Sequence, residues 1–111
     1  MATTSSRIYG PAQIATGPTT VYTVPSNTKA VLRQIHISNP SGSSVTFTLS
    51  IGADGATTRL FSTFTIPANS DPNSARDWFW YIPMTEGEIL TLSAGTNNVL
   101  VIAISADLVT L

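Results

Sequence analysis

The segment SVTFTLSI, residues 44–51, alternates large apolar and small polar side chains without a break. Successive side chains of a β-strand point to opposite faces, so this alternation predicts a strand with one buried and one solvent-facing side. Phe47 stands in phase with Leu49, and we expect it to be fully buried. Turn-forming residues bound the segment, NPSGS before it and GADG after it, and the Asp54–Gly55 dipeptide predicts a tight type I′ turn.

Further strand-like segments lie at short intervals on both sides of residues 44–51. They are rich in β-branched and aromatic residues, are bounded by turn residues, and show no helical period beyond one turn at 69–75. We expect residues 29–38 to pair with 44–51 as a hairpin around PSGS, and the tight turn GTNN to join 88–94 to 98–111. The pattern predicts an all-β fold, a single-domain antiparallel β-sandwich of jelly-roll type. The further segments are 19–25, 29–38, 58–67, 76–83, 88–94 and 98–111.

The N-terminal part of the chain differs from the rest. Its apolar positions are sparse and are interrupted by two Gly-Pro pairs. We therefore expect residues 1–18 to form an extended arm, with one edge strand at most, and residues 19–111 to form the sandwich domain. Ile8 and Tyr9 are large apolar residues of this arm, and we expect them to contact a partner.

The composition indicates a neutral surface and excludes several classes of site. The 111 residues carry a net charge of −1, only 10% of them are charged, and none is cysteine. Without cysteine there are no disulfides, thiolate metal sites or cysteine nucleophiles, and five scattered Lys and Arg residues predict no nucleic-acid binding. The longest apolar run, residues 99–106, is shorter than the about 20 residues of a membrane span, and no signal-peptide pattern is present. We expect a soluble chain with no membrane partner, whose hydroxyl-rich surface favours association.

No residue pattern supports catalysis or a cofactor. His36 is the only histidine and has no catalytic or metal-ligating partner nearby in the sequence, so we expect a structural role. Glu86 and Glu88 flank a glycine; paired carboxylates can serve hydrolysis, but this pattern is more typical of a solvated turn. Nucleophile-elbow and phosphate-binding glycine motifs are missing. We expect no enzymatic activity, no metal and no cofactor.

The segment RDWFWYIP, residues 76–83, is apolar on both faces of a predicted strand. Trp78 and Trp80 share one face of that strand. Phe79 and Tyr81 share the other. Because leaving such a ring exposed forgoes about 1.5–3 kcal/mol, something should cover the second face. We favour a neighbouring subunit; the alternatives are the N-terminal arm and a sugar stacked on the rings.

Residues 99–104 repeat this double-sided pattern. Val99, Val101 and Ala103 share one face, and Leu100, Ile102 and Ile104 share the other. A second strand that is apolar on both faces strengthens the expectation of a homo-oligomer, for which we expect a trimer. The candidate subunit or capsid contacts are Phe79, Tyr81, Leu100, Ile102, Ile104, Ile8 and Tyr9.

Three longer segments occur in a distinctive order between about residues 21 and 108. They are VYTVPSNTKAVLRQIHISNPSGSSVTFTLSIG, then WYIPMTEGEILTLSAG, then the terminal VLVIAISADL. In this order they resemble small β-sandwich structural proteins of tailed bacteriophage virions. The N-terminal arm and the RDWFWY motif are outside the resemblance, which implies a virion setting and supplies no catalytic residues.

The resemblance implies a virion protein that is assembled in the host cytoplasm. We expect capsid decoration or cementing, in which clustered copies contact the major capsid protein or another virion protein. The alternative is a tail, collar or fibre module, including one that binds host carbohydrate. The neutral, hydroxyl-rich surface fits all of these roles.

Overall fold

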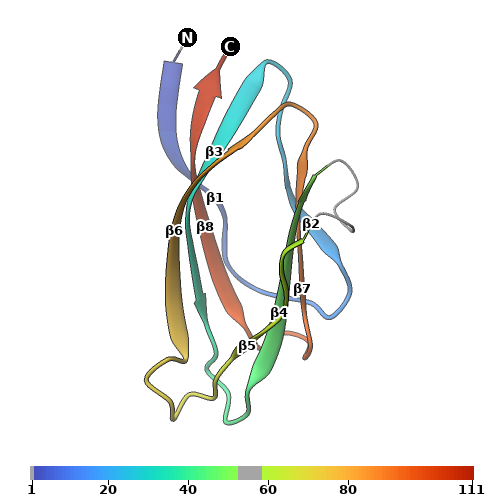
Figure 1. Ribbon diagram of the computed structural model, residues 1–111, viewed down its shortest axis with the longest axis vertical. Helices are drawn as coiled ribbons and strands as arrows, with labels where there is room; N and C mark the ends of the chain where they lie inside the picture. Colours follow the sequence, from blue (N-terminus) through green and yellow to red (C-terminus); the bar gives the residue numbers. More distant parts are fainter. Residues whose placement is uncertain (1, 53–58) are drawn as a thin grey trace.

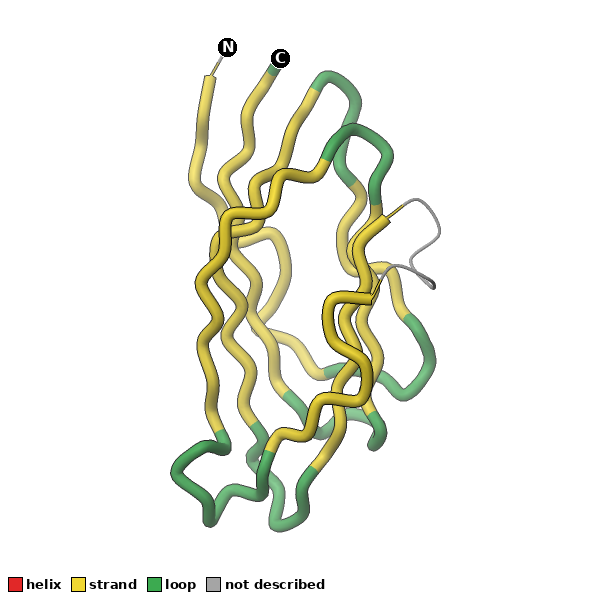
Figure 2. The backbone as a smooth tube through the Cα atoms, in the orientation of Figure 1, coloured by secondary structure: helices red, strands yellow, loops and turns green. Residues whose placement is uncertain are grey.

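The computed structural model describes residues 2–52 and 59–111, which form eight β-strands and no helix (Figures 1 and 2). Residues 69–74, where the sequence allowed one helical turn, form turns and bends. The strands are β1 (Ala2–Gln13), β2 (Thr19–Thr23), β3 (Thr28–Ser38), β4 (Val45–Gly52), β5 (Arg59–Ile66), β6 (Ala75–Met84), β7 (Ile89–Ala94) and β8 (Val101–Thr110).

The strands form two antiparallel sheets of four strands each within the described residues. Sheet A has the order β1-β8-β3-β6, and sheet B has the order β2-β7-β4-β5. The chain passes from one sheet to the other at every connection except that between β4 and β5, which is the strand order of a jelly roll. Figure 1 shows the two facing layers. The prediction of a single-domain antiparallel β-sandwich is confirmed, while the predicted Asp54–Gly55 turn lies outside the described residues.

The predicted hairpin around the PSGS turn is wrong. β3 and β4 lie in opposite sheets, as do β7 and β8, so each connection arches across the sandwich. Turn residues let the chain reverse but do not decide which sheet the next strand joins. Asn39, only 1% exposed, holds the β3–β4 arch: its Nδ2 donates to the carbonyl oxygens of Ser43 and Ile66. Its Oδ1 accepts from the amide and the hydroxyl of Ser41.

The core lies between the sheets and takes large side chains from both. Phe47 of β4 is fully buried, as predicted. Trp78 of β6 stacks on Phe47 across the sandwich with ring centroids 6.3 Å apart, and Trp80 stacks on Trp78 at 6.2 Å. The inner side of β6 therefore closes one flank of the core with aromatic rings. The largest fully buried side chains are Phe47, Leu32, Ile35, Ile37, Leu49, Ile66, Met84, Leu90, Leu92, Leu100, Ile102 and Ile104.

The N-terminal segment contains the one edge strand that the sequence allowed, but it packs against the sandwich more closely than an extended arm would. Most of it forms β1, which pairs antiparallel with β8 as an edge strand of sheet A. The register shifts once around Ile8 and once between Tyr9 and Ala12, so bulges interrupt the strand. These interruptions explain why its apolar positions looked sparse and irregular. Ile8 and Tyr9 pack half-buried against the core, and Ile14 is 3% exposed, so this segment is a strand of the sandwich.

Candidate functional site on the outer face of sheet A

Two aromatic rings stand exposed at the rim of sheet A. Phe79 and Tyr81 of the edge strand β6 are 73% and 69% exposed, whereas Trp78 and Trp80 pack against the core. The predicted division of residues 76–83 between two faces is therefore observed. Apart from the C-terminal residue, these two rings are the exposed large hydrophobic side chains among those that the structure describes.

A bulge in β3 brings two consecutive side chains to the outer face beside these rings. The register of β3 with both β6 and β8 shifts between Leu32, which is fully buried, and Gln34. Arg33 and Gln34 consequently both line the outer face, where an unbroken strand would turn one of them into the core. The Arg33 guanidinium lies over the Tyr81 ring, 5.6 Å from its centroid, in a cation–π contact.

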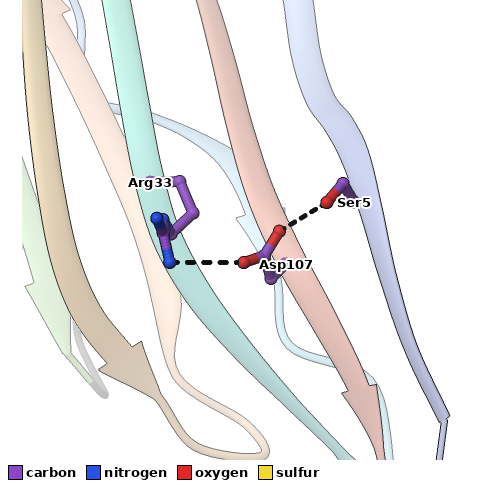
Figure 3. Close-up of polar contacts among 3 residues, drawn as sticks. All are labelled: Ser5, Arg33 and Asp107. Carbon is purple, nitrogen blue, oxygen red and sulfur yellow. Dashed lines mark hydrogen bonds and ion pairs between the residues drawn. The ribbon is translucent and has the colours of Figure 1, made fainter.

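Asp107 connects strands β1, β8 and β3 through two polar contacts (Figure 3). Its Oδ2 lies 3.5 Å from Nη1 of Arg33, and its Oδ1 accepts a hydrogen bond of 2.7 Å from Oγ of Ser5. The Arg33 and Asp107 side chains are 50% and 26% exposed, so solvent screens the ion pair, which contributes at most about 1 kcal/mol. Its main effect is to hold the guanidinium between the Asp107 carboxylate and the Tyr81 ring.

An open groove of about 530 Å³ crosses sheet A among these side chains. Its walls offer two guanidinium groups, a carboxylate, an amide, serine hydroxyls and the Phe79 ring. Such a mixture can hydrogen-bond a polar ligand such as a saccharide, or receive side chains of a protein partner. The lining residues are Ser5, Ser6, Arg7, Arg33, Gln34, Phe79, Trp80, Ser105, Ala106 and Asp107.

His36 pairs with Asp77 of the neighbouring strand β6. Its Nδ1 lies 2.8 Å from Oδ1 of Asp77, and Nε2 of Gln34 donates to the same oxygen at 3.0 Å. The hydrogen bonds from His36 and then from Gln34 hold the pKa of Asp77 below its ordinary value. The sequence did not reveal this partner because it lies 41 residues away in the chain. Within the described residues, no group of three or more His, Asp or Glu side chains could hold a metal ion.

Glu86 and Glu88 accept hydrogen bonds from turns. Oε1 of Glu86 accepts from the Asn27 amide at 2.6 Å, which ties the β6–β7 connection to the β2–β3 turn. Oε1 of Glu88 accepts from the amide and the hydroxyl of Thr85 at 2.7 and 3.0 Å. The two carboxylates thus stabilise the loops at this end of the sandwich.

The assignment of Leu100, Ile102 and Ile104 to a subunit contact is wrong. All three side chains are fully buried in the core. β8 is a central strand of sheet A, and its opposite face carries the half-buried Val101 and Ala103. The alternation separated the two faces correctly, but it could not show which apolar face meets the core.

Ile8 and Tyr9 remain partly accessible where β1 is bulged, so their contact with a partner stays a prediction. The described residues form no helix that is long and apolar enough to cross a membrane. In comparisons with known proteins, no family model and no curated protein matches the chain.

Proposed function

We propose that this chain is a non-enzymatic structural protein of a tailed-phage virion, and that it decorates or cements the capsid as a homotrimer. The observation that carries the proposal is the exposed pair Phe79 and Tyr81 on a strand whose other face fills the core. Residues 21–108 resemble small β-sandwich virion proteins, and jelly rolls recur in viral capsids, which is an argument from analogy of fold.

The exposed pair favours a protein partner over solvent. Burying one such ring stabilises a complex by about 1.5–3 kcal/mol, so a contact that covers both has a substantial driving force. Arg33 lies against Tyr81, and arginine and aromatic residues are the types enriched at the centres of protein interfaces. The ionic groups of this face also favour a protein partner, because Arg33 and Asp107 already pair with each other and need no new counter-ion when the face is covered.

A carbohydrate-binding tail or fibre module is the second candidate. The groove beside Phe79 favours it, because Arg33, Gln34 and Asp107 present planar polar groups that can hydrogen-bond sugar hydroxyls next to a ring on which a pyranose can stack. A glycan array probed with wild-type protein and with Phe79→Ser tests this candidate. The carbohydrate-binding candidate predicts that the wild-type protein binds a glycan on the array and that Phe79→Ser abolishes this binding. The oligomeric state should be the same for both proteins.

Quantitative mass spectrometry of purified virions tests the capsid proposal. A decoration protein should be present in a number comparable to that of the major capsid protein. A number lower by an order of magnitude or more would contradict decoration and favour the tail or collar. Absence of the chain from purified virions would contradict a virion role altogether.

A further inference from the structure

The two edges of sheet A carry opposite charges on its outer face. β1 and β6 are the edge strands, and each presents backbone N–H and C=O groups that pair with no strand of this sheet on the outward side. Arg7 stands exposed on β1 and forms no ion pair with any described residue, while Asp77 stands on β6. Between them, Arg33 and Asp107 neutralise each other. The face therefore has one basic and one acidic edge.

Asp77 is held in position at the acidic edge. The bonds from His36 and Gln34, at 2.8 and 3.0 Å, both reach its Oδ1. The aspartate side chain nevertheless remains 43% exposed, so its other oxygen can meet a group from outside the chain. A carboxylate that its own sheet orients in this way is well prepared for a charge-assisted contact with a guanidinium.

We infer, building on the proposed self-association, that a second copy of the chain adds its β1 to β6, with Arg7 of the second copy opposite Asp77. Every neighbouring pair in sheet A is antiparallel, so β1 and β6 run in opposite directions. A second copy in the same orientation thus brings its β1 antiparallel to β6, as strand addition at a sheet edge requires.

The same register accommodates the exposed aromatic residue next to Asp77. Moving two residues along each strand from the Arg7–Asp77 pair brings Ser5 of the second copy opposite Phe79. Outward side chains then meet outward side chains, because the register moves by an even number of residues. Ser5 is small and lines the groove on its own sheet, so the Phe79 ring of the first copy meets a hollow rather than a bulky side chain.

This contact is head-to-tail, because one edge of each copy meets the opposite edge of the next. Contacts of this kind close into a ring when the rotation between copies allows it. A second copy is favoured over an unrelated partner because this chain itself supplies both complementary edges.

Light scattering of four charge variants tests the inference. Asp77→Arg and Arg7→Asp should each lower the measured mass to that of the 11.7 kDa chain, because each places like charges across the contact. The chain carrying both substitutions should recover the wild-type mass, because the pair is restored with reversed polarity. Lys29→Asp, which reverses a charge on the central strand β3, is the matched control and should keep the wild-type mass. Thermal melting checks that each variant is folded.

The outcomes separate this inference from the proposed function. If wild-type protein is an oligomer and the single variants keep its mass, edge pairing is overturned while self-association stands. If the single variants dissociate but the double variant does not recover, the Arg7–Asp77 pairing is overturned. A wild-type protein that is an 11.7 kDa monomer at all concentrations overturns both, and glycan binding dependent on Phe79 would then support the carbohydrate-binding candidate.

Discussion

Trp78 and Phe79 are adjacent in the chain but serve opposite sides of sheet A. The Trp78 ring stacks on Phe47 in the core at 6.3 Å, whereas Phe79 is 73% exposed on the outer face. One edge strand thus closes the core and presents an apolar surface to the outside. The core does not depend on the exposed rings of Phe79 and Tyr81, so these two rings are available for the proposed self-association.

Replacing Phe47 by alanine should destabilise the sandwich strongly. The side chain is fully buried and contacts both sheets, so its loss removes apolar burial and leaves a cavity, at a cost of about 3–5 kcal/mol. Urea titration of the free energy of unfolding measures this change. Phe79→Ala is the matched control and should change the stability of the isolated chain by less than about 0.5 kcal/mol. Equal losses for both substitutions would contradict the assignment of faces.

Alternation along single strands made the faces of β6 and of β4 up to Leu49 predictable, but Ser50, expected to face solvent, is 3% exposed, and the pairing between strands was not predictable. Phe61 falls out of phase in the sequence of residues 58–67. In the structure, Leu49 is paired with Phe61 and Phe47 with Phe64, so β5 contains one more residue than β4 over the same interval. The out-of-phase Phe61 is the local sign of this bulge, but the sequence of one strand does not show which partner strand it is paired with.

The candidate site was predictable only where it depended on local sequence. The outward direction of Phe79 and Tyr81 follows from alternation within β6. The contacts of Asp107 with Arg33 and Ser5 join residues 74 and 102 positions apart. These contacts depend on the order of strands in sheet A. The order of strands also explains why the predicted hairpin around PSGS was wrong, since turn residues fit a hairpin and an arch between sheets equally well.

Asn39→Ala should weaken the arch between β3 and β4. The side chain is buried and makes three hydrogen bonds within this connection and a fourth to the Ile66 carbonyl of β5, so its removal should cost about 1–3 kcal/mol. Asn69→Ala, which removes an exposed hydrogen bond to the Pro40 carbonyl, is the control and should cost less. Chemical denaturation compares the two, and a larger effect at Asn69 would refute this role of Asn39.

Gly10→Ala should loosen the edge strand β1. Gly10 has a φ of 79°, and a Cβ atom there would overlap the carbonyl oxygen of Ile102 in β8. We expect a loss of about 1–3 kcal/mol and faster hydrogen exchange along β1. Gly17→Ala should have little effect, because nothing lies within 4 Å of the added atom. Unchanged exchange in Gly10→Ala would show that β1 does not depend on this close approach.

The lowered pKa of Asp77 predicts a stability difference that disappears in acid. The folded protein binds the Asp77 proton more weakly than the unfolded chain, in which the pKa of Asp77 is near 3.8. The contribution of the ionised Asp77 carboxylate to the free energy of unfolding is therefore present above that pH. It is lost as the pH falls through the lower folded-state pKa. The difference in unfolding free energy between wild type and Asp77→Asn should therefore be larger at about pH 5 than at about pH 2.

The effect at Asp77 should be small, because its side chain is 43% exposed and solvent screens it. Since the hydrogen bond from His36 is the main cause of the lowered pKa, repeating the comparison in a His36→Ala background should weaken the pH dependence. An undiminished pH dependence in that background would assign it to another group.

The most direct test of self-association through the outer face of sheet A is the mass of the Phe79→Ser/Tyr81→Ser variant by light scattering at micromolar concentration. The two rings contribute little to the core, so the variant should melt cooperatively like the wild type. We predict that wild-type protein is an oligomer and that the folded variant is a monomer of about 11.7 kDa, within the small mass change of the substitutions. A folded variant with the same oligomeric mass as the wild type would contradict this prediction.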